Sequence, residues 1–365
     1  MSSAKPPTWT RRVFAALARS AVVRSIPVVA LTGAVTTAYV LRPRIEPVFK
    51  ERNIPPPGYE VPQHPDFNRG PREPFLMALA RILVLAPTCS LFRIYAKYFN
   101  DFIVDGDLDK YLDNRKPGQG LITCSNHLAT VDEPLLFSSL QKFTNVINPY
   151  KMRWGLCAQE ICFEQGAFLA TYFGAGKSLP IVRGNGVMAP NFKKACDKVR
   201  FGEWVHIFPE GRVHQSGKLG SDLKWGVGRL VANSDPDAPP PLVVPVYQYG
   251  IQNTIKLNKV TNQIESYMPA TGLKFVVKIG DPIPIDDILA KYRKQKAEEG
   301  GNMQELTDAD RWFYKEVVDR VGARLLEMED EVKSEYGHLF PELTNSQMKA
   351  PEVATSESSV ISTAT

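Results

Sequence analysis

One histidine in this chain has a carboxylate at a spacing that could support acid–base chemistry. His127 precedes Asp132 by five residues, and Pro134 follows two residues later. In one regular helix the two side chains would point about 140° apart, so they could not meet. They meet if His127 follows the end of a strand and Asp132 begins the next helix, with Pro134 in its first turn. Asp132 would then hold one imidazole nitrogen, and the other nitrogen would accept a proton from an alcohol.

The same spacing also fits a purely structural arrangement, in which Asp132 caps a helix and His127 is an ordinary loop residue. His206 lies inside a predicted strand and is expected to be structural. His214 follows a predicted turn and stays a minor candidate. Both interpretations of His127 remain open at this point, and the last two histidines are expected at the surface: His64 and His338.

Several other chemistries lack their motifs. The sequence contains no Gly-x-Ser-x-Gly nucleophile elbow and no His-Glu-x-x-His zinc motif. Residues 174–178 imitate the end of a phosphate-binding loop, but Thr171 occupies its required first glycine position. What remains is a histidine base without a covalent nucleophile, which favours direct attack of a substrate hydroxyl on an ester or activated carbonyl. We expect no cofactor and no metal.

The cysteines are spread along the chain without a CxxC pair. The sequence has five of them: Cys89, Cys124, Cys157, Cys162 and Cys196. This pattern predicts neither a zinc site nor a disulfide framework. We expect reduced, mostly buried thiols.

Two arginines follow predicted strands and are candidate phosphate contacts. Arg183 closes one strand, and Arg212 ends the turn 208–212, which also contains Glu210 and Gly211. Guanidinium groups present planar forks that suit phosphate oxygens. Either arginine taken alone also fits a solvated loop position.

Short apolar runs alternate with helical stretches between residues 102 and 280. Six runs have the length and β-branched content of strands: 121–125, 154–158, 179–182, 204–208, 242–247 and 273–279. Four stretches are predicted helices: 134–141, 189–200, 226–233 and 307–336. This alternation predicts an α/β fold with a mixed or mainly parallel central sheet flanked by helices.

The N-terminal region is basic. Residues 1–50 carry eight Lys or Arg and one Glu, a net +7, so the other 315 residues sum to −2. Residues 1–44 contain no acidic residue and have the composition of a mitochondrial targeting region. Within them, the uncharged run 26–41 is a membrane-anchor candidate that would span a bilayer or lie on it. The rest of the chain lacks the basic patch expected of a protein that binds nucleic acid.

Three further segments complete the expected organisation. Residues 45–72 form a proline-rich linker, 73–340 a catalytic domain, and 341–365 a Ser- and Thr-rich tail that is expected to be disordered. Within the domain, the apolar stretch 75–99 carries three basic residues, so it is predicted to be amphipathic rather than spanning.

An aromatic cluster lies directly before residue 176. Phe168, Leu169, Tyr172 and Phe173 are expected to enter one membrane leaflet beside the active site, in a segment far below spanning length. The alternative is a buried core helix.

Four short motifs occur in the order and spacing of those of the glycerolipid acyltransferase superfamily. They are Asn126-His127-x4-Asp132, residues 176–183, Phe208-Pro209-Glu210-Gly211-Arg212 and Val244-Pro245-Val246. The resemblance extends from about residue 75 to residue 335 and implies the fold of that superfamily. It also implies that His127 is the base, that Asp132 orients it, and that four residues bind the substrate: Arg183, Glu210, Gly211 and Arg212.

Stretches such as 183–187 and 204–211 resemble one branch of this superfamily. That branch implies a membrane-bound enzyme that transfers an acyl chain from a phospholipid to a lysophospholipid, especially monolysocardiolipin, without coenzyme A. Such an enzyme would remodel cardiolipin in mitochondria, facing the intermembrane space, on the inner or outer membrane. The exchange of one ester for another is nearly isoenergetic, so it requires neither nucleotide nor metal. Whether the chain forms a homo-oligomer stays open.

Two alternatives are kept. A coenzyme-A-dependent lysophospholipid acyltransferase would carry the same four motifs and differ only in its acyl donor. A non-catalytic membrane scaffold would use the apolar and basic segments and would not depend on His127.

Overall fold

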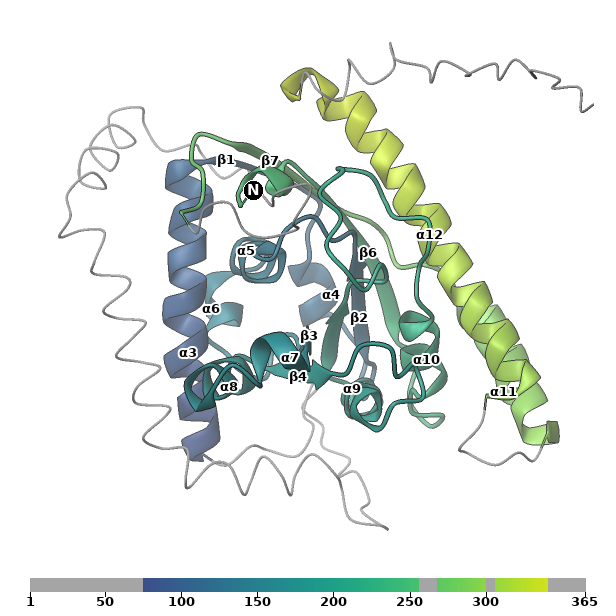
Figure 1. Cartoon of the computed structure of the whole chain (residues 1–365). Coiled ribbons are helices and arrows are strands. Elements are labelled where there is room, and N and C mark those ends of the chain that lie inside the picture. The colour runs from purple at the N-terminus through teal and green to yellow at the C-terminus, as the bar shows by residue number, and fades with distance from the viewer. Residues whose placement is uncertain (1–74, 256–267, 300–305, 341–365) are drawn as a thin grey trace, which may run out of the picture.

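The structure is a computed structural model that describes residues 75–255, 268–299 and 306–340 (Figure 1). The expected targeting region 1–44, the linker 45–72 and the tail 341–365 lie outside the described residues. The described residues therefore belong to the expected catalytic domain, 73–340.

The centre of the fold is a five-stranded sheet in the order β1-β7-β6-β2-β5. Its strands are β1 (Asp101–Asp105), β2 (Leu121–Ser125), β5 (Trp204–Ile207), β6 (Leu242–Tyr249) and β7 (Lys274–Ile279). β2 pairs in parallel with both β5 and β6, and β1 pairs in parallel with β7, whereas β6 and β7 are antiparallel. The predicted mixed, mainly parallel sheet is confirmed.

A smaller parallel sheet continues the central one beyond β5. It consists of β3 (Gly155–Ala158) and β4 (Ser178–Ile181). A single bridge between Trp154 and Val205 joins its start to β5. The strands predicted at 154–158 and 179–182 therefore lie beside the central sheet.

Helices cover both faces of the central sheet. Their bounds are α3 (Phe75–Ile94), α4 (Asp109–Asp113), α5 (Asp132–Ser139), α6 (Phe143–Val146), α7 (Gln159–Cys162), α8 (Ala167–Ala175), α9 (Pro190–Arg200), α10 (Gly226–Ala232), α11 (Asp286–Glu299) and α12 (Asp308–Tyr336), with a π-helical turn at Tyr95–Phe99 and 3-10 turns at Ile251–Asn253 and Gly337–Leu339. In Figure 1, α3, α5 and α6 lie on one side of the sheet, and α9, α10 and α12 lie on the other.

The side chains of the strands alternate between two hydrophobic cores. Val243 and Val276 belong to the core that contains residues of α9 to α12. Their chain neighbours Val244 and Val277 belong to the core that contains residues of α3 to α6. This alternation follows from the two-residue period of a strand. A sheet buried on both faces explains why its strands read as nearly continuous apolar runs.

Helix α3 and the π-helical turn after it, Phe75–Phe99, are long and apolar enough to cross a membrane by length and composition. One face of the helix is nevertheless buried in the protein, where Arg81 is 1% exposed and donates from Nη1 to the carbonyl of Gly174 at 2.9 Å. The opposite side leaves Phe75, Ile82 and Ile94 exposed. The exposed side chains of α3 are apolar and the buried Arg81 is charged, so the burial pattern does not show the predicted amphipathic helix.

Some elements were not predicted from the sequence, among them β1, α4, α6, α7 and α11. β1 begins and ends with aspartate, a residue that strands seldom carry. Its extended conformation comes from pairing with β7, about 170 residues later in the chain. Helix α5 begins at Asp132, two residues before the predicted start at Pro134.

Candidate active site

The candidate residues gather at one edge of the central sheet. β2, β5 and β6 are parallel, so the chain leaves all three strands at the same edge. His127 follows the end of β2, and Phe208 directly follows β5. Open α/β sheets place their ligand sites at this edge.

Asn126 fixes the chain immediately after β2. Its side-chain oxygen accepts the N–H of Gln248, and its amide nitrogen donates to the carbonyl of Gln248, both at 2.9 Å. The side chain of Gln248 in turn donates from Nε2 to the carbonyl of Asn126 at 2.7 Å. Both residues are buried. Three hydrogen bonds to β6 therefore hold the backbone that leads into His127.

His127 and Asp132 are in direct contact, as a strand end followed by a helix start requires. Nδ1 of His127 lies 2.9 Å from Oδ2 of Asp132. The same oxygen accepts the backbone N–H of Leu128 at 2.6 Å and that of Ala129 at 2.9 Å. Asp132 is completely buried, whereas the His127 side chain keeps 19% of its surface exposed. A carboxylate held in this way keeps the imidazole proton on Nδ1, so Nε2 carries the lone pair.

Glu210 supports the same loop from a distant part of the sequence. Its Oε1 accepts the backbone N–H of His127 at 2.8 Å, and its Oε2 accepts that of Gly220 at 3.0 Å. Burial raises the pKa of Glu210, and the hydrogen bonds from the two amides oppose this rise. Both carboxylate oxygens are engaged by the protein itself. These contacts describe a support for the His127 backbone, which differs from the substrate-binding role implied by the resemblance.

The turn after β5 carries Gly211 and Arg212 at the surface. Gly211 has a φ of +67°, in the left-handed region that favours glycine. Nε of Arg212 donates to Nε2 of His214 at 3.1 Å, and the backbone N–H of His214 donates to the carbonyl of His127 at 2.7 Å. Burial and the nearby Arg212 lower the pKa of His214. Arg212 is therefore connected to the His127 loop through one intervening residue.

The ring of Phe208 covers one face of the His127 imidazole. The ring of Phe208 stacks on it with centroids 3.9 Å apart and planes 10° from parallel. The ring of His206 meets Phe208 edge-on at 4.6 Å, and its Nδ1 lies 2.9 Å from Oγ1 of Thr123. Burial lowers the pKa of His206 well below its usual value, so this histidine is neutral at physiological pH. These contacts agree with the structural role predicted for His206.

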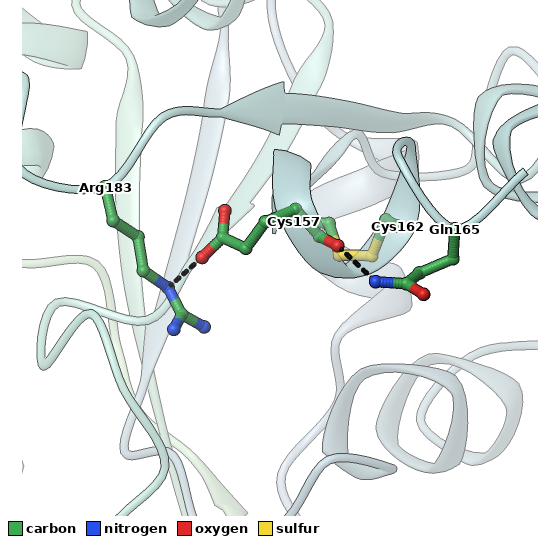
Figure 2. Close-up of a disulfide and its surroundings, with 5 residues drawn as sticks. Cys157, Cys162, Gln165 and Arg183 are labelled. Carbon is green, nitrogen blue, oxygen red and sulfur yellow. Dashed lines mark hydrogen bonds and ion pairs between the residues drawn. A yellow bond between two sulfur atoms is a disulfide. The ribbon is translucent and has the colours of Figure 1, made fainter.

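Arg183 contacts a different part of the protein. Its Nε pairs with Oε1 of Glu160 at 3.3 Å, and about half of each side chain is exposed. Figure 2 shows this pair beside the one-turn helix α7, where the side chain of Gln165 also donates to the carbonyl of Glu160. An exposed ion pair of this kind contributes little free energy. Among the described contacts, Arg212 is connected to the His127 loop through His214, whereas Arg183 forms an ion pair with Glu160.

The expectation of five reduced thiols was wrong. Cys157 in β3 and Cys162 at the end of α7 form a disulfide, with Cα atoms 6.3 Å apart (Figure 2). The turn from strand to helix folds the intervening residues back, and spacing alone does not reveal this approach. The other three cysteines are buried free thiols, as expected: Cys89, Cys124 and Cys196. Within the described ranges, no group of three or more His, Cys, Asp or Glu is arranged to hold a metal ion.

The aromatic cluster that was predicted to contact a membrane lies on α8. Phe168 is 44% exposed and Leu169 is 36% exposed. Tyr172 is partly buried and its hydroxyl lies 3.1 Å from Oγ1 of Thr88 in α3, and Phe173 is also partly buried. Of the nine residues of α8, Ala175 alone is fully buried. The alternative of a buried core helix is therefore wrong, and the start of α8 presents apolar side chains to the surroundings.

Comparison with known proteins gives this site its context. Residues 109–248 match the protein family described as Acyltransferase, from the start of α4 to β6. A protein called taffazin from Dictyostelium discoideum is 35% identical over 187 residues, which are 51% of this chain and 61% of that protein. Tafazzin of Drosophila melanogaster is 31% identical over 55% of this chain and 50% of its own length. The chain is therefore similar to acyltransferases over residues 109–248 and to proteins named tafazzin over about half of its length.

Another similar protein is named for a different activity. An N-acylphosphatidylethanolamine synthase of Arabidopsis thaliana is 34% identical over 48% of this chain and 60% of its own length. The chain thus spans between half and about three fifths of the length of these relatives. A solved 1-acyl-sn-glycerophosphate acyltransferase from Thermotoga maritima is 20% identical and covers 60% of this chain and 79% of its own, with a TM-score of 0.40.

Two contributors to this site are not predicted from the sequence. Gln248 lies two residues after the Val244-Pro245-Val246 motif, but only the pairing of β6 with β2 shows that it faces Asn126. Phe208 belongs to the motif at 208–212, but its type and position do not predict a role for it. Its stacking on His127 depends on the neighbouring ends of β2 and β5.

Proposed function

We propose that this protein is a phospholipid–lysophospholipid transacylase in which His127 is the general base. The observation that carries the proposal is the 2.9 Å contact between Nδ1 of His127 and Oδ2 of the buried Asp132. That contact leaves Nε2 of a partly exposed imidazole as the proton acceptor. None of the hydrogen bonds found within the described residues engages Nε2.

The chemistry that follows is direct acyl exchange. Nε2 of His127 removes the proton of the acceptor hydroxyl while the hydroxyl oxygen attacks the ester carbonyl of the donor lipid. The bond between the carbonyl carbon and the donor's glycerol oxygen then breaks, and the imidazolium returns its proton to that oxygen. The carboxylate of Asp132 stabilises the imidazolium between the two proton transfers. One ester and one alcohol are consumed, and one of each is formed.

The substrate assignment is a diacyl phospholipid as donor and monolysocardiolipin as preferred acceptor, with cardiolipin as product. The resemblance to tafazzins supports it. Arg212 and Arg183 support it as well, because both are exposed cations at the ends of strands and suit a phosphate head group.

The proposed location is a mitochondrial membrane, facing the intermembrane space. The exposed Phe168 and Leu169 support contact of the body with lipid. The disulfide between Cys157 and Cys162 supports an oxidising compartment. In this assignment residues 73–340 form the acyltransferase domain, and residues 1–44 direct the chain to the organelle.

A second candidate function is transfer of the acyl chain to an amine. The 34% identity to an N-acylphosphatidylethanolamine synthase favours it. The same base at His127 would then take a proton from the attacking nitrogen, and an amide would form in place of an ester.

The test uses the purified full-length protein in vesicles that contain a phospholipid labelled in one acyl chain. Three acceptors are compared without any thioester: monolysocardiolipin, a lysophosphatidylcholine and phosphatidylethanolamine. The proposal expects labelled cardiolipin as the main product. Label on the amine of phosphatidylethanolamine would establish the second candidate, and transfer that required added acyl-coenzyme A would establish a thioester-dependent enzyme. Absence of transfer under all conditions would favour the non-catalytic scaffold.

A cellular measurement addresses the substrate independently. Cells that lack this protein should accumulate monolysocardiolipin, as measured by lipid mass spectrometry. Cells that express the His127→Ala protein should show the same accumulation, because this variant lacks the base. A non-catalytic scaffold would retain its function in this variant, and monolysocardiolipin would then not accumulate.

A further inference from the structure

The imidazole of His127 is covered on one face by the ring of Phe208. The centroids lie 3.9 Å apart and the planes are 10° from parallel, so the two rings overlap face to face. The rings come from different strands, since His127 follows β2 and Phe208 follows β5. Cys124 and Ile207 are register partners at the ends of these strands, which places the two following segments side by side.

Phe208 is itself in contact with another ring, that of His206. His206 lies two residues earlier and therefore on the same face of β5. Its ring meets Phe208 at 90° with centroids 4.6 Å apart, and Phe137 of α5 packs against His206 at 4.6 Å. His206 is buried and is anchored to Thr123. The aromatic contact to His127 therefore rests on the sheet and on α5.

The hydrogen bonds of His127 do not fix the tilt of its imidazole ring. Asp132 fixes the position of Nδ1, and Glu210 fixes the backbone N–H. A single hydrogen bond at Nδ1 still permits the ring to tilt about that bond, and a tilt would move Nε2 away from the acceptor hydroxyl. A flat ring at van der Waals distance from the imidazole limits this tilt.

We infer that Phe208 is a positioning residue for His127, and that its ring holds the plane of the imidazole and stabilises the imidazolium that forms during acyl transfer. The face of an aromatic ring attracts a cation, so the stacked arrangement favours the protonated intermediate as well as the geometry. The motif at 208–212 would thus support the base twice, through the ring of Phe208 and through the carboxylate of Glu210. The inference rests on the proposed function of His127 as the base.

The first experiment measures kcat and KM of the full-length Phe208→Leu and Phe208→Tyr proteins with the labelled phospholipid and monolysocardiolipin. Leucine fills similar space but has no aromatic face, whereas tyrosine keeps the ring. We expect kcat to fall about 3- to 30-fold in Phe208→Leu, with little change in KM, and to recover in Phe208→Tyr. A rise in KM at unchanged kcat would identify Phe208 as a lipid contact and overturn the inference.

The second experiment examines the stacking in the resting enzyme and needs no activity. In protein labelled at histidine, the ring protons of His127 should appear upfield because of the ring current of Phe208. The signals are assigned by their loss in His127→Ala. Ordinary shifts for His127 in the unsubstituted protein would overturn the inference even if Phe208→Leu failed to fold.

The two proposals fail in different ways. If His127→Ala kept its kcat, the proposed function would be wrong, whatever the position of the His127 ring protons. If His127→Ala lost activity while folded Phe208→Leu kept the full kcat, His127 would remain the base and only the positioning role of Phe208 would be lost.

Discussion

The carboxylate of Glu210 accepts the backbone N–H of His127 at 2.8 Å, although 83 residues separate them in the chain. Because the other carboxylate oxygen accepts the N–H of Gly220, Glu210 joins two segments of the site through their backbones. Replacing Glu210 by Gln removes one of these acceptors and leaves a partly buried amide without its partner. We expect the free energy of unfolding to fall by about 1–3 kcal/mol, and kcat to fall with it.

The control for this change is Glu298→Gln, which alters an exposed carboxylate on α11. Denaturant unfolding and the acyl transfer assay should not distinguish this control from the unsubstituted protein. A Glu210→Gln enzyme with unchanged stability and unchanged kcat would show that the carboxylate does not support the loop.

Asp132 should act on the rate through its charge. In Asp132→Asn the side-chain oxygen can still accept from Leu128 and Ala129, but the negative charge beside the imidazolium is gone. We expect kcat to fall about 10²-fold or more in Asp132→Asn and in His127→Ala, the contribution typical of a positioned acid–base group. Thermal unfolding would establish that both proteins are folded. Near-normal turnover in folded His127→Ala would refute the mechanism.

The disulfide between Cys157 and Cys162 predicts a thiol count. Alkylation of the unfolded, unreduced protein should label three cysteines, and prior treatment with a dithiol should raise this number to five. Cys157→Ser should lower the free energy of unfolding by about 2 kcal/mol, the loop-closure contribution of a bridge across so few residues. The variant and the unsubstituted protein should be equally stable once both are reduced. Five labelled thiols in the unreduced protein would contradict the bridge.

His206 predicts how stability depends on pH. Its pKa is lowered by burial, so below about pH 6.5 the unfolded chain binds a proton that the folded protein refuses. The stabilisation is therefore complete above the unfolded pKa and is lost as the pH falls below it, at up to about 1.4 kcal/mol per pH unit. His206→Phe keeps a ring and removes the titration. Denaturant unfolding between pH 8 and pH 5 should show the unsubstituted protein losing stability faster than this variant, and parallel curves would exclude the effect.

The exposed start of α8 predicts membrane association of the body. In protein that lacks residues 1–44, we expect carbonate-resistant association to persist, and Phe168→Asp combined with Leu169→Asp should abolish it, because both side chains are exposed and apolar. Leu326→Asp is the matched control, since Leu326 is exposed on α12, away from α8 (Figure 1). If the truncated protein is already soluble before these substitutions, the N-terminal region is the sole anchor.

The local patterns of the sequence were sufficient for the general architecture. Six apolar runs predicted six of the seven strands of the described structure, because buried strands of a parallel sheet need β-branched residues on both faces. The change from a strand end to a helix start between His127 and Asp132 could also be predicted. In one helix the two side chains would point apart, and Pro134 suits the first turn of a new helix. These features depend on residues that are neighbours in the chain.

The tertiary structure decided which distant residues meet. Glu210 reaches the backbone of His127, Phe208 reaches its ring, and Gln248 holds Asn126, only because β2 lies between β5 and β6. The chain order of the strands does not specify that arrangement, and β1, with an aspartate at each end, becomes a strand only by pairing with β7. Contacts between residues 80 to 120 positions apart arise from strand order and packing, and no local periodicity encodes them.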